Sequence, residues 1–351
     1  MRDRSIDVGR GLLVIMMVYG HVLQFFGDSQ IFSLAGTLID IINLTVFPTF
    51  VFYFGATAVL AYLKKPYLQA LPGMARTVLR AYAVFCLSGV GYRVLRENKA
   101  FAVGTVRRVM QLTDIPGWSE FLIAFALYGA LLIVGYVVFD WLSRKPFACL
   151  LVSVLCVASC EIVPYGSIPT RLALIIGGKG FAYFPVVQYM PYFLGGMLYA
   201  NGDKRLRRKL FFAAVVMSLG GVAHWHFFGF PNRFPPQWGW ILLPAALVSA
   251  VVLLSRAICA LAGNGIGRIA DALCGVLGHF GGASLYYLLA SNLVLFALSG
   301  RGIVPAMARK SVLPWTLPIQ SPQGAACWAG LLLGSLWFVS SLAGRGKGRR
   351  G

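Results

Sequence analysis

Long runs of apolar residues recur along the whole chain and constrain its fold more than any other feature. A helix needs about 17 to 25 predominantly apolar residues to cross the hydrocarbon core of a bilayer. Ten such runs, bounded by charges, Pro or Gly, lie near residues 11–27, 38–63, 78–95, 119–139, 147–163, 181–200, 210–229, 238–262, 279–300 and 325–343. They do not alternate apolar and polar residues, as strands of a membrane β-barrel do. The sequence predicts an all-α, polytopic transmembrane helical bundle of about ten spans.

The composition excludes an ordinary soluble domain of this length. Hydrophobic residues make up 58% of the 351 residues and charged residues 12%, and the mean hydropathy is +0.75. A soluble chain of this kind would have too little polar surface to cover its core. The seven cysteines lie in or beside apolar runs and form no CxxC pair or zinc-ligand cluster, so no metal site is expected. We expect residues 1–351 to form one membrane domain with no soluble extension.

Lysine and arginine are unevenly distributed between alternate loops. In membrane proteins they collect in short cytoplasmic loops, and with ten spans and an internal N-terminus the cytoplasmic segments hold 20 of the 31 basic residues. This split predicts that both termini are cytoplasmic. The net charge of +20 then reflects contact with anionic lipid headgroups, and nucleic acid is not expected as a partner. One predicted external loop breaks the trend, which indicates either a miscounted span or an anionic partner; its basic residues are Arg93, Arg96, Lys99, Arg107 and Arg108.

Arg10 and His21 in the first run are the strongest candidates for chemistry. At about 100° per residue they share one helix face, and a rise of roughly 1.5 Å per residue separates them by about 16 Å. Arg10 is then at the cytoplasmic surface, where Asp7 can pair with it, and His21 lies near mid-membrane. A histidine inside a span usually faces the bundle interior or a wet cavity. Alternatively, Arg10 only anchors the topology and His21 makes a structural hydrogen bond.

Four further charged residues are weaker candidates. Arg76 and Arg80 share a helix face before the third run and could hold phosphate, or they could belong to an ordinary basic loop. Glu120 opens the fourth run and Glu161 closes the fifth. Either carboxylate could orient the His21 imidazole through a hydrogen bond, although carboxylates at span ends are often simply solvated.

Several segments, in order along the chain, resemble the membrane acyltransferase-3 family. Arg4 to Leu12 and the following run to Gly20-His21 look like its first span, whose hallmark is an Arg and a His separated by ten residues. The further similar segments are Phe47 to Gly55, Gly117-Trp118, Tyr189 to Gly196, Arg233 to Pro236, and Ser284 to Leu289. The chain departs from the family where Phe54-Gly55 replaces the usual Ser-Gly. It also has Ala-Ser-Asn at 290–292 where relatives often have a His, so no catalytic role is carried over to that helix.

This resemblance implies transfer of an acyl group, usually acetyl, from cytoplasmic acetyl-CoA to a sugar hydroxyl. The acceptor would be an envelope polysaccharide, a glycolipid or a lipid-linked sugar, and the location the inner (cytoplasmic) membrane. Acyl-CoA is then a co-substrate, and no permanently bound cofactor is expected. His21 could serve as the base or as the carrier of the acyl group. Arg10 is predicted to take part in catalysis and to bind the coenzyme A phosphates, with Arg76 and Arg80 as further phosphate ligands.

Two other functions are consistent with a bundle of this kind. A secondary transporter or flippase for a glycan precursor would use polar residues to line a path, and commonly has inverted repeats and paired broken helices. Neither feature is evident in the sequence. A non-catalytic membrane partner is the third possibility.

Overall fold

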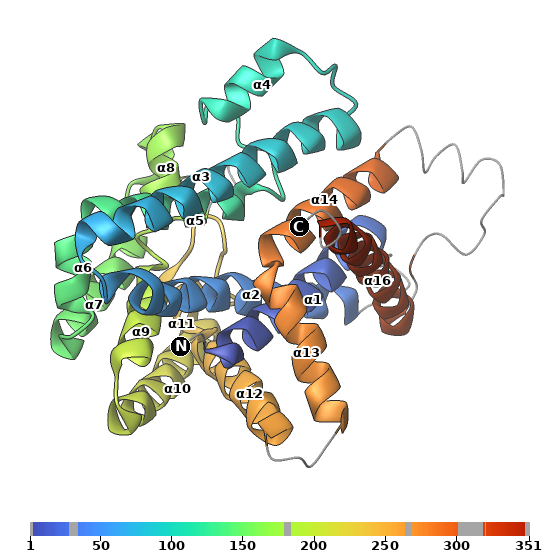
Figure 1. The fold of residues 1–351 in the computed structure, drawn as a ribbon. Coiled ribbons are helices and arrows are strands. Elements are labelled where there is room, and N and C mark those ends of the chain that lie inside the picture. The colour runs from blue at the N-terminus through green and yellow to red at the C-terminus, as the bar shows by residue number, and fades with distance from the viewer. Residues whose placement is uncertain are drawn as a thin grey trace.

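The computed structural model describes residues 3–27, 34–178, 184–263, 268–300, 319 and 321–347, and these are almost entirely helical (Figure 1). No strand occurs among them; the one β-bridge joins Gly27 to Ile319. The all-α prediction is therefore confirmed. The helices are α1 (Arg4–Phe26), α2 (Leu34–Ala58), α3 (Tyr67–Gly91), α4 (Val103–Met110), α5 (Glu120–Val134), α6 (Tyr136–Leu142), α7 (Pro146–Ile162), α8 (Thr170–Ile176), α9 (Met190–Asn201), α10 (Lys204–Phe228), α11 (Trp238–Leu242), α12 (Ala245–Gly263), α13 (Arg268–Gly282), α14 (Ser284–Ser299) and α16 (Pro322–Lys347).

Fewer helices can cross a membrane than the ten runs suggest. Among the described residues, six helices are long and apolar enough, or up to eight if each of two bent pairs counts as one span. The chain is thus a multi-pass membrane protein, but ten straight spans are not found. The predicted span 181–200 is helical only from Met190 onward, and its first residues, 181–183, lie outside the described part. The run 147–163 forms α7, which has only 17 residues.

Two helix pairs are sharply bent, a feature not evident in the sequence. The α5–α6 pair bends by 93° and the α13–α14 pair by 76°. Gly135 lies between the first two helices, where its backbone leaves the helical region, and Ala283 lies between the second two. Apolar periodicity does not reveal such breaks, because the hydropathy continues across them.

Helices α1 and α2 occupy the middle of the bundle (Figure 1). Asp3 caps α1 by accepting a hydrogen bond from the Ser5 backbone N–H at 2.9 Å, which satisfies one of its first four amide groups. The helix that packs most closely against α1 is α13, and glycine residues on both helices permit the approach. A Cβ on Gly281 would lie 1.7 Å from the Asp7 carbonyl oxygen, and one on Gly11 would lie 2.0 Å from that of Leu277. Small residues thus allow these two helix backbones to pack closely.

The aromatic run on α2 packs against α5, α9 and the segment before α9. The ring of Phe47 lies 4.2 Å from that of Phe184 and 5.8 Å from that of Phe125, measured between centroids. Pro48 lies within α2, which continues as an α-helix to Ala58 before a π-helical turn at Val59–Leu63. These large buried rings fix α2 against its neighbours, and they form one wall of the site described below.

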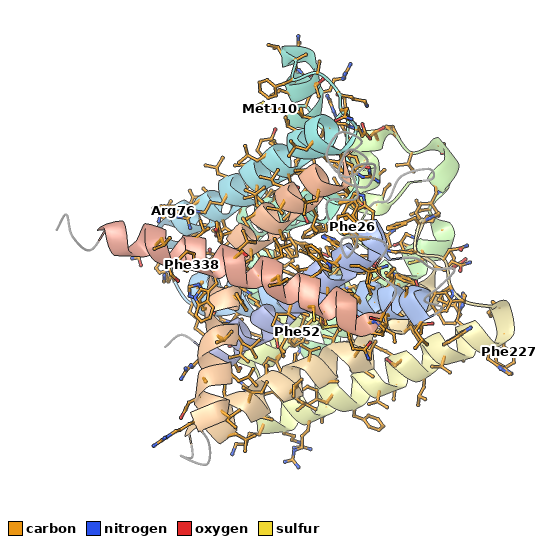
Figure 2. All side chains as sticks on the ribbon, turned by 90° about the vertical axis from the view of Figure 1, so that its right-hand side faces the viewer. Phe26, Phe52, Arg76, Met110, Phe227 and Phe338 are labelled. Carbon is orange, nitrogen blue, oxygen red and sulfur yellow. The ribbon has the colours of Figure 1, made fainter. Side chains whose placement is uncertain are left out.

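The outer surfaces of several helices carry large apolar side chains. Phe227 on α10 is 73% exposed and Phe338 on α16 is 65% exposed, and Figure 2 shows both pointing away from the bundle. A soluble monomer rarely exposes contiguous apolar surface of this extent. Contact with lipid tails explains it, because a bilayer accepts apolar side chains on the outer face of a bundle.

Candidate functional site

His21 lies on the inner face of α1 and lines a small pocket that combines apolar residues with a few polar ones. Its side chain is 9% exposed, and the pocket has a volume of about 50 Å³. A cavity measured in this way needs roughly 10 to 15 Å³ to hold one water molecule, so the pocket has room for a few water-sized groups. The residues lining it are Met17, Gly20, His21, Gln24, Ile42, Asn43, Val46, Phe47, Phe50, Phe121, Phe184 and Arg233.

Asn292 on α14 fixes the tautomer of His21. The Asn292 Nδ2 group donates to the Trp118 carbonyl oxygen at 3.2 Å, and a carbonyl can only accept. The Asn292 Oδ1 atom therefore faces His21, 2.9 Å from Nδ1. Because this oxygen is also only an acceptor, Nδ1 carries the hydrogen and Nε2 keeps the lone pair. His21 thus has the arrangement of a base whose second nitrogen is held by an orienting residue.

Trp118 connects this hydrogen bond to the rings around His21. Its indole packs edge-on against the imidazole, 5.6 Å between centroids, and lies 4.7 Å from the ring of Phe25. The φ angle of Trp118 is 66°, in the left-handed region that bulky residues rarely adopt. Such a conformation persists only where the surroundings enforce it, and it clusters at functional sites. Nearby, the hydroxyls of Ser88 and Ser119 bond to each other at 2.7 Å and are fully buried.

Arg233 brings a positive charge to the same pocket from the loop between α10 and α11. Its guanidinium carbon lies 4.9 Å from the Phe184 ring centroid and 4.5 Å from that of Phe234. Its Nε is buried without a hydrogen-bond partner, and no described residue forms an ion pair with it. Burial lowers the pKa of Arg233, while electrostatic interactions with Tyr189, Glu120 and Asp40 act in the opposite direction. An arginine stays protonated under such conditions, so the charge is permanent.

Glu120, at the first turn of α5, is buried beside the site but does not line the pocket. It is 8% exposed and within electrostatic range of Arg233. The hydrogen bond that orients the His21 ring comes from Asn292, an amide, and not from a carboxylate. Glu161 is exposed at the end of α7, outside the pocket lining. The structure therefore places one of the two candidate carboxylates close to the site and the other at the surface.

Arg10 contacts the far end of α2. Its Nη2 donates to Thr57 Oγ1 at 2.8 Å and reaches the Tyr53 carbonyl oxygen at 3.5 Å. Asp7 is half-buried one turn earlier, where its carbonyl meets Gly281. The pocket lining on α1 begins at Met17, so Arg10 lies outside it. Arg10 and His21 share one helix, but the structure does not bring them into one site.

Arg76 and Arg80 are exposed on α3 and do not line the His21 pocket. Their predicted role in holding the coenzyme A phosphates stays a prediction. Within the described part of the chain, neither side chain forms a hydrogen bond or ion pair, whereas Arg10 is bonded to Thr57.

The unusual basic loop after α3 is largely satisfied within the protein. Arg93 forms ion pairs with Asp114 and Glu97, and Lys99 pairs with Glu97 at 2.9 Å. Burial alone would raise the pKa of Glu97. The hydrogen bonds from Arg93 and Lys99 outweigh burial and hold this pKa below its usual range. Arg96 donates to the Ser299 carbonyl and stacks over Phe25. Much of the excess charge therefore has internal partners, and an external anionic partner is not required to explain it.

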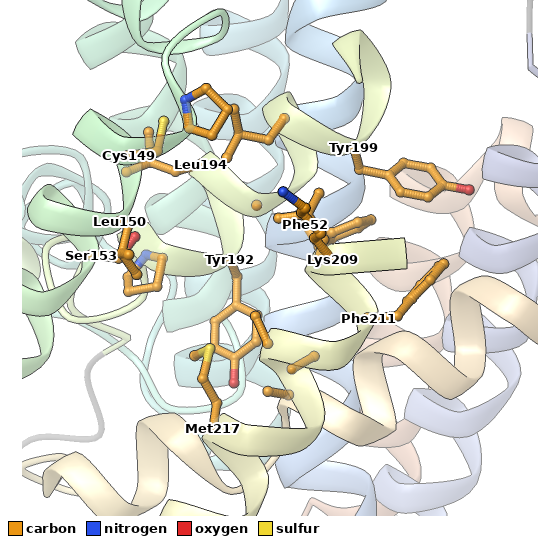
Figure 3. Close-up of a pocket in the computed structure, with 18 of the residues that line it drawn as sticks. Phe52, Cys149, Leu150, Ser153, Tyr192, Leu194, Tyr199, Lys209, Phe211 and Met217 are labelled. Atoms are coloured by element: carbon orange, nitrogen blue, oxygen red, sulfur yellow. The ribbon is translucent and has the colours of Figure 1, made fainter. Parts of the chain in front are cut away.

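A larger groove of about 400 Å³ lies between α7, α9, α10 and α12. Figure 3 shows its aromatic side chains, among them Phe52, Tyr192 and Tyr199, with Lys209 beside them. Lys209 is the one charged residue in the described lining, and neither a histidine nor a carboxylate accompanies it. The groove has the lining of a lipid-facing surface and lacks the groups that acyl transfer needs.

Comparison with models of known protein families and with curated protein sequences finds no match. The resemblance to the acyltransferase-3 family therefore still rests on the short motifs alone, and the function it implies stays a prediction.

Two residues at the pocket were missed by the sequence reasoning. Asn292 was set aside because it stands where relatives often have a histidine, yet it is the residue that bonds His21. The sequence feature that could have identified Asn292 is its position in the middle of an apolar run, because an amide there is costly to bury unless it is paired. Arg233 was noted only as part of a similar segment. Its signal is an isolated arginine between aromatic and proline residues in a short loop.

Proposed function

We propose that this chain is an integral membrane O-acyltransferase that moves an acyl group, in the first instance acetyl, from acyl-CoA to a glycan hydroxyl. The observation that carries the proposal is the hydrogen bond between His21 Nδ1 and Asn292 Oδ1, which leaves Nε2 as a base in a small pocket. Acyl transfer to a hydroxyl needs such a base. The family resemblance supplies the substrate classes.

In this mechanism His21 moves one proton through the reaction. Nε2 accepts the proton of the acceptor hydroxyl as its oxygen bonds to the thioester carbonyl carbon, and the carbonyl π electrons move onto oxygen. When the carbonyl re-forms, the carbon–sulfur bond breaks and the imidazolium returns the proton to the thiolate. The same lone pair would also allow a covalent acyl-imidazole. A labelled acyl group trapped on His21 in the absence of acceptor would distinguish the two routes.

The two substrates are proposed to approach from opposite ends of α1. Arg10 lies toward one end, and the residues that line the pocket on α1 extend from Met17 to Gln24 toward the other. Acyl-CoA would enter from the Arg10 end, with its phosphates on the arginine, and the acceptor from the Arg233 end. This places Arg10 in the cytoplasm, in agreement with the distribution of basic residues.

The finer topology is part of the same proposal: ten membrane segments, some of them bent or short, with both termini cytoplasmic. Reporter fusions after Gly351 and within residues 201–209 test it. Both fusions should report cytoplasm. A C-terminus found outside would require an odd number of segments and would remove Arg10 from the acyl-CoA side.

A transporter or flippase for a glycan precursor is the second candidate, because the two bent helix pairs are typical of transporters. The two functions differ in their need for His21 as a base. Replacement of His21 by glutamine keeps a hydrogen-bonding side chain but removes the proton-accepting nitrogen. Transport would survive this change more readily than acyl transfer.

Mass spectrometry of the envelope polysaccharide and glycolipids, with and without the gene, tests the proposed function in the cell. Loss of the gene should remove mass equal to one acyl group per modified sugar, and alkaline de-esterification should remove the same mass from the wild-type material. Unmodified polysaccharide and glycolipids in both strains would contradict the proposal.

A further inference from the structure

We propose that Arg233 is a catalytic residue that stabilises the oxyanion formed during acyl transfer. This inference rests on the proposed function. It adds a positively charged group to the pocket that contains the base, and the loop between α10 and α11 supplies this group.

The first observation is that Arg233 lines the pocket and that one of its nitrogens lacks a hydrogen-bond partner. The guanidinium is held between the rings of Phe184 and Phe234 and lines the pocket that contains His21. Among the described residues, none donates or accepts a hydrogen bond with it, and its Nε is buried and unsatisfied. The Arg233 side chain is half-buried as a whole, and a buried polar atom such as its Nε is costly to leave without a hydrogen bond.

A second unpaired polar atom lies in the same pocket. Gln24 Oε1 is buried without a hydrogen-bond partner, one turn beyond His21 on α1. Glu120 and Asp40 are near enough to act on Arg233 electrostatically, but neither forms an ion pair with it. The pocket therefore contains a positive charge and an unused acceptor, which together fit a ligand with a negatively charged oxygen and a donor group.

The size of the pocket decides which anion fits. At about 50 Å³ the pocket matches a few water-sized groups better than a whole sugar ring or a diphosphate. It has room for the reacting acyl carbonyl and hydroxyl. The negative charge that develops there is the oxyanion of the tetrahedral intermediate, whose C–O electron pair has moved onto the former carbonyl oxygen. Its proton has gone to His21 Nε2, so a fixed positive charge close by lowers the barrier.

Steady-state kinetics of Arg233→Gln test this role. The reconstituted protein would be assayed with varied acetyl-CoA and with de-esterified envelope polysaccharide as acceptor. We expect kcat to fall by roughly 10²- to 10³-fold, the usual effect of removing one oxyanion donor, with both KM values within about twofold of wild type. Arg233→Lys keeps a positive charge without the planar fork, and it should recover part of the lost kcat.

Arg207 provides a matched control. It also stacks on an aromatic ring, with its guanidinium carbon 4.9 Å from the Tyr199 centroid, but its Nε donates to the Tyr199 carbonyl oxygen at 3.0 Å. Arg207→Gln should leave kcat unchanged. Thermal unfolding of each purified variant in detergent shows that the assayed protein is folded, and Arg233→Lys preserves size and charge if Arg233→Gln is unstable.

Three results would overturn the inference. Near wild-type kcat in folded Arg233→Gln would make Arg233 structural. An increase confined to the KM for acetyl-CoA would make it a phosphate ligand, and one confined to the KM for polysaccharide would make it an anchor for an acidic acceptor. If wild-type protein transfers no acyl group at all, the proposed function itself fails, which separates that failure from the failure of Arg233.

Discussion

The two ends of α1 hold their polar side chains in different ways. Toward the N-terminus, Arg10 is bonded to Thr57 on α2. About 16 Å along the helix, His21 has one nitrogen bonded to Asn292 and lines a pocket together with Arg233, where we propose that it acts as a base. An arginine with a protein partner can serve as an anchor as well as a ligand. A base and an unpaired guanidinium in one pocket lack an equally simple structural role, so the chemistry is expected at the His21 end.

The largest expected effect is at His21. His21→Gln keeps a side chain that can bond to Asn292 but cannot accept a proton, and it should abolish acylation in membranes, a loss of at least about 10²- to 10⁴-fold. Protein abundance in the membrane should stay near normal. His224 is the matched control, because it is also a buried histidine, 3% exposed, on α10. Glycan acylation by His21→Gln at the wild-type level would make His21 a packing residue.

Removal of the orienting amide should have a smaller effect than removal of the base itself. Asn292→Leu preserves volume but frees the imidazole to take either tautomer and rotate, and kcat should fall by about ten- to a hundredfold. Ser291→Ala changes the neighbouring buried residue, whose hydroxyl bonds only within its own helix to Leu288. That control should keep full activity. Equal losses in the two variants would indicate a general packing effect on α14.

Substitution at the other end of α1 should affect substrate use and not insertion. Lysine preserves the charge of Arg10 but not the planar fork that grips two oxygens. Arg10→Lys should weaken acyl-CoA use by about tenfold to over a hundredfold, corresponding to roughly 1.5 to 3 kcal/mol for one charge-assisted bond. Arg4→Lys, at the exposed start of α1, should do almost nothing. Full activity of Arg10→Lys at every acetyl-CoA concentration would leave Arg10 only its structural bond to Thr57.

The smallest expected effect concerns the ion-pair cluster after α3, which does not line the His21 pocket. Because its pairs hold the pKa of Glu97 below the unfolded value, they add stability above an unfolded pKa of about 4.3. That stability should be lost as the pH falls through the lower folded pKa. Thermal unfolding in detergent at successively lower pH should show a smaller acid-induced decrease for Glu97→Gln than for wild type. Glu161→Gln, at an exposed carboxylate, should behave like wild type; no difference between the two variants would exclude this contribution.

The fold class followed from the sequence, while the shape of individual helices did not. Apolar runs predict helices that can enter a bilayer, and helices are found at each of the predicted runs. The bends near Gly135 and Ala283 depend on local backbone conformation, which hydropathy does not contain. Similarly, residues 184–189 are mostly apolar but not helical, and Phe184 among them packs against Phe47 inside the bundle.

The site was predictable only where one helix carries it. The spacing of Arg10 and His21 predicts a common face by helical geometry, and the structure places both residues on α1. The partners of His21 come from elsewhere, with Asn292 on α14 and Arg233 in the loop after α10. A single sequence gives no distances between helices. It therefore could not show that an amide orients the imidazole instead of Glu120 or Glu161.

The most direct test of the central claim is acyl transfer by the purified protein in lipid vesicles. Acetyl-CoA labelled in the acetyl group would be supplied with de-esterified envelope polysaccharide, and the label on the glycan would be counted before and after mild alkali. Wild-type protein should place alkali-labile label on the glycan, and folded His21→Gln protein should place none. Unlabelled glycan with folded wild-type protein, or equal labelling by both proteins, would contradict the assignment of His21 as the base of a membrane acyltransferase.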